Sequence, residues 1–309
     1  MKILVTGVGG QLGHDVMNEL IGRGHTGVGS DIAPEYSGVA DGSAVTTAEY
    51  VPMDITDAAQ VSEVITKVSP DVVIHCAAWT AVDAAEDNDK KAKVKAINAD
   101  GTQNIANVCK QLDCKMVYIS TDYVFDGKGN TPFEVDSQKN GLSVYGKTKS
   151  QGEDFVTNTL KEYFIIRISW VFGINGNNFI KTMLKLANMG KTELNVVDDQ
   201  IGSPTYTYDL SKLMVDMMES NKYGIYHATN EGFTSWCEFA REIFRFANKD
   251  VKVNGVSTDE YMKLVPSQAS RPLNSRMSKD SLDKNGFKRL PSWQDATRRY
   301  ILELDKENK

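Results

Sequence analysis

Short apolar runs alternate with amphipathic stretches through the first two thirds of the chain. The runs carry little internal polarity, which is typical of strands buried on both faces, and the stretches between them repeat apolar residues with helical spacing. The predicted strands cover residues 3–5, 72–75, 115–120, 164–168 and 225–228. The predicted helices cover residues 12–21, 57–69, 90–112, 145–160, 179–187 and 208–218. This alternation predicts an α/β fold with a Rossmann-type, doubly wound parallel sheet.

The alternation becomes less regular after Gly173. We therefore expect residues 1–173, with return elements near 206–230, to form the Rossmann domain. Residues 174–205 and 231–309 are expected to form a smaller, interleaved C-terminal lobe. Its predicted parts are an extended segment at 194–197, an aromatic helix with Trp236, Phe239 and Phe244, an irregular stretch at 266–272 and a terminal helix near 293–304.

Composition narrows the class of protein. At 309 residues the chain is longer than one typical domain, and its net charge of −6 without any Lys/Arg run argues against nucleic-acid binding. No apolar run approaches the roughly 20 residues that span a bilayer, and the first residues lack a signal-peptide pattern, so we expect a cytoplasmic protein without membrane contact. The four cysteines have neither CxxC nor zinc-type spacing, so we expect reduced core thiols and no metal site.

A glycine-rich turn follows the first predicted strand directly and opens the first predicted helix. Gly7, Gly10 and Gly13 form a GxxGxxG pattern, with Gln11 and Leu12 between the last two glycines. Glycines allow the tight turn and let backbone N–H groups approach a pyrophosphate, and the helix N-terminus adds partial positive charge. At a strand-to-helix junction this pattern predicts a dinucleotide site. The Rossmann domain is therefore the predicted NAD(P)-binding domain, and the smaller lobe is the predicted substrate-binding part.

An acidic residue, Asp31, lies 18 residues beyond Gly13, where a carboxylate accepts hydrogen bonds from the adenosine ribose. No Lys or Arg between Gly24 and Thr66 is available to neutralise an additional 2′-phosphate. NADH is therefore the favoured cofactor, and NADPH is the alternative. The alternative for Asp31 is a loop aspartate, because the glycines before it make a poor strand. His14 is expected to lie exposed on the first helix rather than to approach a phosphate.

Tyr145 and Lys149 have the spacing that places two side chains on one helix face about a turn apart. An adjacent ammonium and a cationic nicotinamide ring are expected to lower the pKa of Tyr145 toward the working range. Thr121, at the end of a predicted strand, is placed to polarise a carbonyl while Tyr145 donates a proton and the cofactor donates hydride. These three residues are the predicted catalytic set for carbonyl reduction. The alternative is a solvated Tyr and Lys, because the spacing alone is common.

Three segments end predicted strands at the edge of the sheet where ligands of parallel sheets bind. They contain Ala77, Ala78 and Trp79; Thr121 and Asp122; and Trp170. We expect them to converge on one cleft. For the two tryptophans the alternative is core packing, because large aromatic residues often close the edge of a sheet.

The glycine pattern, Thr121, Tyr145 and Lys149 together resemble the extended short-chain dehydrogenase/reductase family over the whole chain. Longer segments are similar to its dTDP-4-dehydrorhamnose reductase branch. These segments are HCAAWTAVDAAE at 75–86, STDYVFDG at 120–127, RISWVFG at 167–173, QIGSPT at 200–205 and RP at 271–272. The resemblance implies that Thr121, Tyr145 and Lys149 are catalytic and that Lys149 also holds the nicotinamide ribose.

The same resemblance implies the other contacts and the reaction. The implied cofactor contacts are Asp54 and Ile55 near the adenine and Ala77, Ala78 and Trp79 along the cleft, and the implied substrate contacts are Thr121, Asp122 and Trp170. The implied reaction is the reduction of the C4 ketone of dTDP-4-dehydro-β-L-rhamnose to dTDP-β-L-rhamnose, a step of deoxysugar nucleotide biosynthesis that needs no metal. The connection at 34–50 is longer than expected for this branch.

Other functions stay open on the same fold. A reductase or epimerase could act on another nucleotide-linked deoxysugar, whereas a 4,6-dehydratase would carry Glu where Tyr123 stands. A related non-catalytic branch serves as a regulatory subunit of a methionine adenosyltransferase, and fold alone does not distinguish it. The intact catalytic set favours an enzyme. A homodimer is the default expectation, because symmetric dimers are the commonest assemblies.

Overall fold

In the computed structural model, which describes residues 1–265 and 269–307, seven parallel strands form one central sheet. Their order across the sheet is β11-β6-β5-β4-β1-β2-β3. The bounds are β1 (Lys2–Thr6), β2 (Thr26–Asp31), β3 (Glu49–Pro52), β4 (Val72–His75), β5 (Lys115–Thr121), β6 (Tyr163–Ile168) and β11 (Gly224–His227). The order reverses direction between β1 and β4, as in a doubly wound sheet. The predicted fold class is confirmed.

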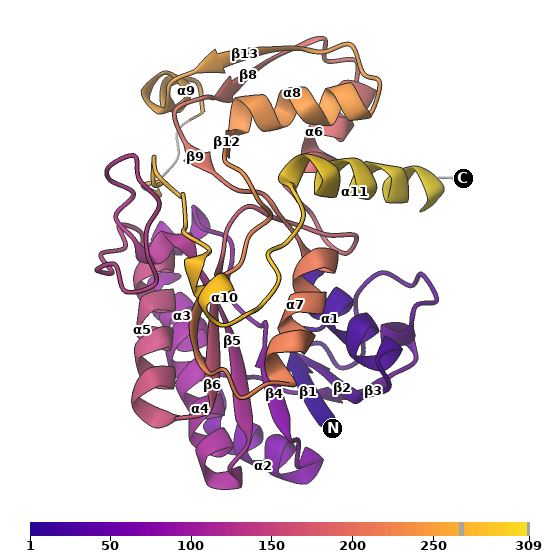
Figure 1. The fold of residues 1–309 in the computed structure, drawn as a ribbon, viewed down its shortest axis with the longest axis vertical. Helices are drawn as coiled ribbons and strands as arrows, with labels where there is room; N and C mark the ends of the chain where they lie inside the picture. Colours follow the sequence, from indigo (N-terminus) through magenta and orange to yellow (C-terminus); the bar gives the residue numbers. More distant parts are fainter. Residues whose placement is uncertain (266–268, 308–309) are drawn as a thin grey trace.

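Helices cover both faces of this sheet (Figure 1). Successive side chains of a strand point to opposite faces, so Ile3 and Val5 pack on one side and Leu4 on the other. The first side is covered by α1 (Gln11–Gly22) and α7 (Thr207–Met218), and the second by α2 (Ala58–Val68), α4 (Gly101–Leu112) and α5 (Val144–Thr159). Burial on both faces explains the uninterrupted apolar runs in the sequence.

The glycines before Asp31 lie within a strand, contrary to the loop alternative. A Cβ atom at Gly27 would lie 2.9 Å from the Met17 methyl carbon, and one at Gly29 would lie 3.2 Å from Val8. The absence of side chains therefore lets α1 pack closely against β2. Neither β2 nor β3 was predicted, because their sequences lack an apolar run.

The helix predicted at 90–112 is interrupted by a different helical form. It consists of α3 (Lys91–Lys95), a π-helical turn at Ala96–Asp100 and α4. Such π turns are frequent at functional sites, because they shift the side chains of one turn. Here the turn brings Asn98 against the segment that follows β4.

The less regular part of the chain lies beyond the carboxyl ends of the strands. It contains α6 (Phe179–Asn188), β8 (Glu193–Val197), α8 (Trp236–Phe246), β13 (Lys252–Val256), α9 (Thr258–Leu264) and α11 (Trp293–Glu307), seen in the upper part of Figure 1. The strands β8 and β13 pair in parallel and pack on α8. Two-residue strands complete it: β7 (Val171–Phe172) pairs with β10 (Thr205–Tyr206), and β9 (Ile201–Gly202) with β12 (Thr234–Ser235).

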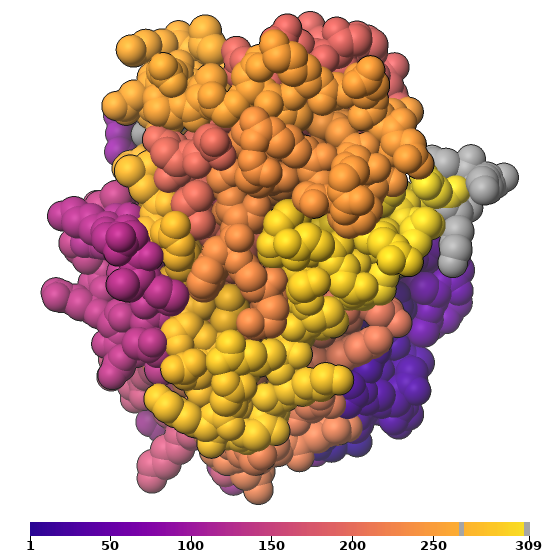
Figure 2. Space-filling view, turned by 45° about the horizontal axis from the view of Figure 1, so that its top comes forward, coloured from indigo at the N-terminus to yellow at the C-terminus, as the bar shows by residue number. Residues whose placement is uncertain are grey.

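The chain after residue 269 returns across the molecule. Figure 2 shows this yellow segment, with α10 (Asp280–Lys284) and α11, lying over the face between the upper elements and the sheet domain. Of the irregular stretch expected at 266–272, residues 266–268 lie outside the described residues.

Within the described residues, no helix combines the length and apolar character needed to cross a membrane. The thiols of Cys109, Cys114 and Cys237 are free and buried, as expected. Cys76 is also free but only half-buried, so the expectation of a core position was wrong for this residue. It follows β4 directly, where the strand leaves the core and reaches a cavity.

Candidate active site

A cavity of about 780 Å³ opens at the carboxyl ends of the strands. Strand ends contribute Thr6 from β1, Asp31 from β2, Cys76 after β4, Thr121 from β5 and Ile168 from β6. The loops after parallel strands meet at this edge, where the strand order reverses. Its size lies in the upper part of the range of about 300–1,000 Å³ typical of cofactor and small-molecule sites.

The glycine turn forms one wall of the cavity, and the three predicted glycines differ in their physical role. Gly7 has φ +70°, and a Cβ atom there would lie 2.5 Å from the Ala77 nitrogen. A Cβ atom at Gly13 would lie 2.3 Å from the Gly7 oxygen. At Gly10 it would meet only the Gly7 oxygen, at 3.2 Å, so this glycine leaves the approach to the backbone open.

The N-terminus of α1 is available to an anion from the cavity. Gly10 is the N-cap residue, and no side chain caps the first turn. The N–H groups of that turn are therefore free to bind a phosphate. Gln11 and Leu12 also line the cavity. The side-chain oxygen Oε1 of Gln11 accepts hydrogen bonds from the Gly173 nitrogen and the Asn178 amide, both at 3.0 Å.

The adenosine side of the predicted site is formed around Asp31. Its carboxylate accepts hydrogen bonds from the Gly9 nitrogen at 3.1 Å and from the Ile32 nitrogen at 2.8 Å, so it is fixed beside the glycine turn. Asp54 and Ile55 line the same cavity, as implied by the resemblance. The cation Lys93 also lines the cavity, from α3. It was not predicted, because only the stretch between Gly24 and Thr66 was considered for cations that could bind a 2′-phosphate.

The segment after β4 divides into lining and non-lining residues. Ala77 and Ala78 line the cavity, whereas Trp79 is not among the described residues that do so. The Trp79 indole N–H donates to the Ala81 oxygen at 3.0 Å. Its backbone is held by Asn98, which accepts from the Trp79 nitrogen at 2.8 Å and donates to its oxygen at 3.2 Å. The structure therefore does not bring the Trp79 side chain to the cleft.

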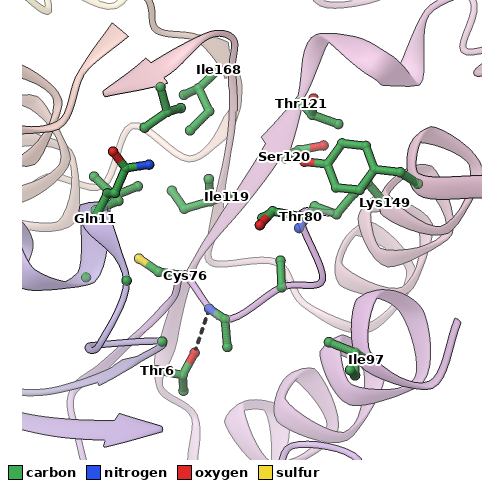
Figure 3. Close-up of a pocket in the computed structure, with 18 of the residues that line it drawn as sticks. Thr6, Gln11, Cys76, Thr80, Ile97, Ile119, Ser120, Thr121, Lys149 and Ile168 are labelled. Atoms are coloured by element: carbon green, nitrogen blue, oxygen red, sulfur yellow. Dashed lines mark hydrogen bonds between the residues drawn. The ribbon is translucent and has the colours of Figure 1, made fainter. Parts of the chain in front are cut away.

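Thr121, Tyr145 and Lys149 meet on one side of the cavity. Figure 3 shows Thr121 and Lys149 near Ser120, with Gln11 and Cys76 across the cavity from them. The Lys149 ammonium lies 4.1 Å from the centroid of the Tyr118 ring, and the Tyr145 ring packs edge-on against Tyr123 with centroids 5.6 Å apart. Both lysine and phenol are thus held by aromatic neighbours.

The pKa of Tyr145 differs from the expectation. It is raised to about 12, chiefly by burial; the hydrogen bond with Thr121 opposes the rise, and the charge of Asp122 adds to it. The protein's own groups do not lower the pKa as predicted, because burial outweighs their influence. The lowering expected from a cationic nicotinamide ring stays a prediction. Burial also lowers the pKa of Lys149 to about 7, against the attraction of Glu153. Tyr145 is therefore protonated at neutral pH, the form that a proton donor requires.

Asp122 directly follows Thr121 and is 2% exposed. Its carboxylate accepts a hydrogen bond from the Thr121 hydroxyl at 3.0 Å. Burial raises the pKa of Asp122 to about 6, and hydrogen bonds with Ser275 and Thr121 oppose the rise. A polar group is thus available beside the position that a ketone would take between Thr121 and Tyr145.

Trp170 both packs and lines the cavity, so neither alternative describes it alone. Its backbone is left-handed, with φ +50°, and its ring stacks on Trp236 with centroids 3.7 Å apart. A Cβ atom at Gly202 would lie 2.9 Å from the Trp170 ring, so this glycine admits the indole. Trp236 was predicted only as part of an aromatic helix; it also lines the cavity, together with Phe179, which was not predicted.

A second cavity of about 330 Å³ adjoins the first. The two share Phe179 and Trp236 as lining residues. Other residues of the second cavity include the apolar Met183 and Val196 and the paired Asp83 and Arg271, whose atoms approach to 2.6 Å. Among the described residues, no group of three His, Cys, Asp or Glu side chains is placed to hold a metal ion.

His14 is buried, not exposed as expected. It is 1% exposed, its Nδ1 lies 2.7 Å from the Tyr36 hydroxyl, and its Nε2 lies 3.1 Å from the Asn18 amide and 3.4 Å from Asp41. The long connection between β2 and β3 folds over α1 and covers this side chain. His14 does not line the cavity among the described residues.

Comparison with known proteins places this arrangement in a family. A family model described as the RmlD substrate binding domain matches residues 1–306. The chain belongs to this family. A relative named spore coat polysaccharide biosynthesis protein SpsK, from Bacillus subtilis, is 38% identical over 302 residues, which cover 98% of this chain and 97% of that protein.

Solved structures related to the RmlD family chain agree over nearly its whole length. A dTDP-4-dehydrorhamnose reductase from Clostridium acetobutylicum has a TM-score of 0.86 and 36% identity, covering 99% of this chain and 100% of that one. A dTDP-4-dehydrorhamnose reductase from Bacillus anthracis, solved in complex with NADP, has a TM-score of 0.84 and 37% identity, covering 98% and 99%. The two-part fold of this chain is therefore shared along its full length.

Proposed function

We propose that this chain is an NAD(P)H-dependent oxidoreductase that reduces the C4 ketone of dTDP-4-dehydro-β-L-rhamnose to dTDP-β-L-rhamnose. The observation that carries this proposal is the meeting of Thr121, Tyr145 and Lys149 in the cavity that the glycine turn also lines. Relatives over the full length are named dTDP-4-dehydrorhamnose reductase. Residues 1–173 with 206–230 would form the cofactor domain, and residues 174–205 and 231–309 the substrate lobe.

The residues present fit a nicotinamide dinucleotide. The uncapped first turn of α1 and the open approach at Gly10 suit the pyrophosphate, and the fixed carboxylate of Asp31 suits the adenosine ribose. Asp54 and Ile55 would lie along the adenine, Ala77 and Ala78 along the middle of the cofactor, and Lys149 at the nicotinamide ribose. When bound, the reduced cofactor supplies hydride.

The chain's own groups would handle the ketone oxygen. The Thr121 hydroxyl donates a hydrogen bond that polarises the carbonyl, and the protonated Tyr145 phenol transfers its proton to the oxygen as the carbon becomes reduced. The phenolate that remains is stabilised by the ammonium of Lys149. The single Thr121 hydroxyl hydrogen, donated to Asp122 in the structure, turns to the ketone oxygen in this step. Asp122 and Trp170 would orient the sugar ring beside these groups.

The second cavity supports a substrate with a large group attached to the sugar. It adjoins the wall formed by Trp236 and Phe179, and it offers apolar surfaces together with Arg271. A nucleotide needs an apolar slot for its base and a cation for its phosphates. We place the nucleoside diphosphate of the substrate there.

We propose NADH as the preferred cofactor. The Asp31 carboxylate stands where a 2′-phosphate would bring a second negative charge, and like charges repel. The feature that favours NADPH is Lys93, an exposed cation that also lines this cavity. We also propose a cytoplasmic location and a homodimer; light scattering of the purified chain tests the homodimer, and cell fractionation tests the location.

The test is oxidation of NADH, and separately of NADPH, with dTDP-4-dehydro-β-L-rhamnose generated in place. NMR of the product should identify dTDP-β-L-rhamnose, and kcat/KM should be higher with NADH. If the product is a different 6-deoxysugar, the proposed carbonyl reduction stands, but the proposed configuration of the product is wrong. Binding of NADH without turnover of any ketosugar would overturn the proposed activity.

A further inference from the structure

The catalytic helix carries a third side chain on the same face. Tyr145, Lys149 and Glu153 follow one another at four-residue spacing in α5, so they lie one above the other. The first two line the cavity, whereas Glu153 does not and is 1% exposed. A carboxylate is therefore buried one helical turn beyond the catalytic lysine.

This carboxylate joins three elements of the fold. It accepts hydrogen bonds from the Ser120 hydroxyl at 2.6 Å and from the Arg167 Nε and Nη2 atoms, both at 2.8 Å. Lys139 lies 3.3 Å from it. Ser120 directly precedes Thr121 on β5, and Arg167 belongs to β6. One side chain thus connects the helix of Tyr145 and Lys149 to the strand of Thr121.

Lys149 has few groups that favour its charge. It is 3% exposed, and among the described residues no carboxylate lies within 4.0 Å of its ammonium. The neighbours that face it are the Tyr118 ring from β5, His75 and Cys76 from the end of β4, and Glu153 from its own helix. Burial lowers the pKa of Lys149 to about 7, and Glu153 is the first group that opposes this fall.

We propose that Glu153 is a positioning residue that fixes α5 against the end of β5 and keeps Lys149 in its ammonium form. The proposal rests on the proposed function, where Lys149 holds the cofactor ribose and Thr121 polarises the ketone. Arg167 shares the carboxylate and gives it a fixed direction, because a bidentate pair with a third hydrogen bond allows little rotation. An ion pair that only stabilised the fold would need neither the link to β5 nor the place beside Lys149.

The first experiment measures Glu153→Gln against pH. Two readouts are needed: kcat/KM for ketosugar reduction, and the Kd of NADH from its fluorescence without any sugar. Both should weaken at high pH, because Lys149 loses its proton there. In Glu153→Gln this alkaline limb should move to lower pH by about one unit, since removing a neighbouring opposite charge changes a pKa by that order.

A matched variant separates this effect from loss of stability. Glu153→Gln leaves Arg167 buried without its partner, which destabilises a fold, so Glu153→Gln/Arg167→Met is measured beside it. The control is Asp209→Asn, because Asp209 is 6% exposed, accepts from Arg299 at 2.9 and 2.6 Å and does not line the cavity. The control should lower Tm and leave the alkaline limb in place.

The outcomes distinguish the two proposals. A shifted limb in the NADH Kd of either Glu153 variant, absent in Asp209→Asn, supports the positioning role even if no ketosugar is turned over. An unshifted limb in both variants, with a loss of Tm like that of Asp209→Asn, overturns it and leaves Glu153 as part of a structural ion pair. Absence of turnover in the wild-type chain concerns the proposed function alone.

Discussion

Replacing Tyr145 with Phe removes a single hydroxyl from the cavity. The ring of Tyr145 packs edge-on against Tyr123, and phenylalanine keeps this contact. Lys149, which the proposed mechanism places at the cofactor ribose, is unchanged. We therefore expect Tyr145→Phe to fold and to bind NADH with nearly the wild-type Kd.

The loss should fall on kcat. General acid catalysis by a positioned side chain contributes about 10²- to 10⁴-fold, which corresponds to about 3 to 5 kcal/mol of transition-state stabilisation. Burial keeps the pKa of Tyr145 near 12, so the phenol is protonated at the assay pH and its proton is available for transfer. Lys149→Ala, by contrast, should weaken both kcat and NADH binding.

The assay is steady-state oxidation of NADH, combined with NADH binding measured by fluorescence. Tyr123→Phe is the matched control, because it removes a second phenol hydroxyl from the same cavity and preserves the same ring contact. It should retain turnover within a few-fold of wild type. Comparable turnover in Tyr145→Phe and Tyr123→Phe would falsify the assignment of Tyr145 as the proton donor.

Three further variants test the cofactor and substrate parts of the cavity. Asn175→Ala should raise the Kd of NADH about tenfold with little change in kcat. The Asn175 amide donates to the Gly9 and Gly10 oxygens at 2.8 and 3.3 Å, and a lost buried hydrogen bond costs about 1 kcal/mol or more. An unchanged Kd contradicts this. Asp31→Asn should improve kcat/KM for NADPH relative to NADH, and an unaltered ratio would refute the charge argument. Trp236→Leu should raise the KM of the sugar several-fold and leave the KM of NADH unchanged. The substitution removes the stacking of Trp236 on Trp170, worth about 1 kcal/mol, beside the proposed sugar site. Equal effects on both KM values count against this.

The sheet and the glycine turn were predictable because their signals are local. An apolar run such as 72–75 has few structural alternatives, and a glycine triplet between a strand and a helix has a defined geometric purpose. The structure supplies that purpose: side chains at Gly7 and Gly13 would collide with backbone atoms. A side chain at Gly13 would collide with the turn itself, and one at Gly7 would collide with the segment that follows β4, the neighbouring strand of the sheet.

The burial of His14 was not predictable, because it depends on a distant segment. The connection between β2 and β3 has no periodicity of its own, yet Tyr36 from that connection contacts His14 at 2.7 Å. Similarly, Asn175 reaches the glycine turn from 165 positions along the chain. Side chains of this kind are recognised only when the fold places them together.

The direction of the Trp79 side chain shows a different limit. Sequence reasoning placed the whole segment 77–79 at the edge of the sheet, and its backbone does lie there. The π-helical turn carries Asn98 to the Trp79 backbone, while the indole nitrogen bonds to Ala81 instead of lining the cavity. A π-helical turn in a neighbouring helix therefore contributes to a feature that no strand-end rule could determine.

The effect of the protein's own groups on the pKa of Tyr145 was predicted in the wrong direction, because the four-residue spacing has two opposing effects. Four-residue spacing brings Lys149 onto the face of Tyr145, but the same packing buries both groups and disfavours both charged forms. A phenol that stays protonated is well suited to donating a proton to a ketone. Burial makes the ammonium form of Lys149 harder to keep, and Glu153 is the group that most opposes the fall of its pKa to about 7. Removing the Glu153 carboxylate from water costs free energy. Support of Lys149, one helical turn away, is a function that explains why this carboxylate is buried.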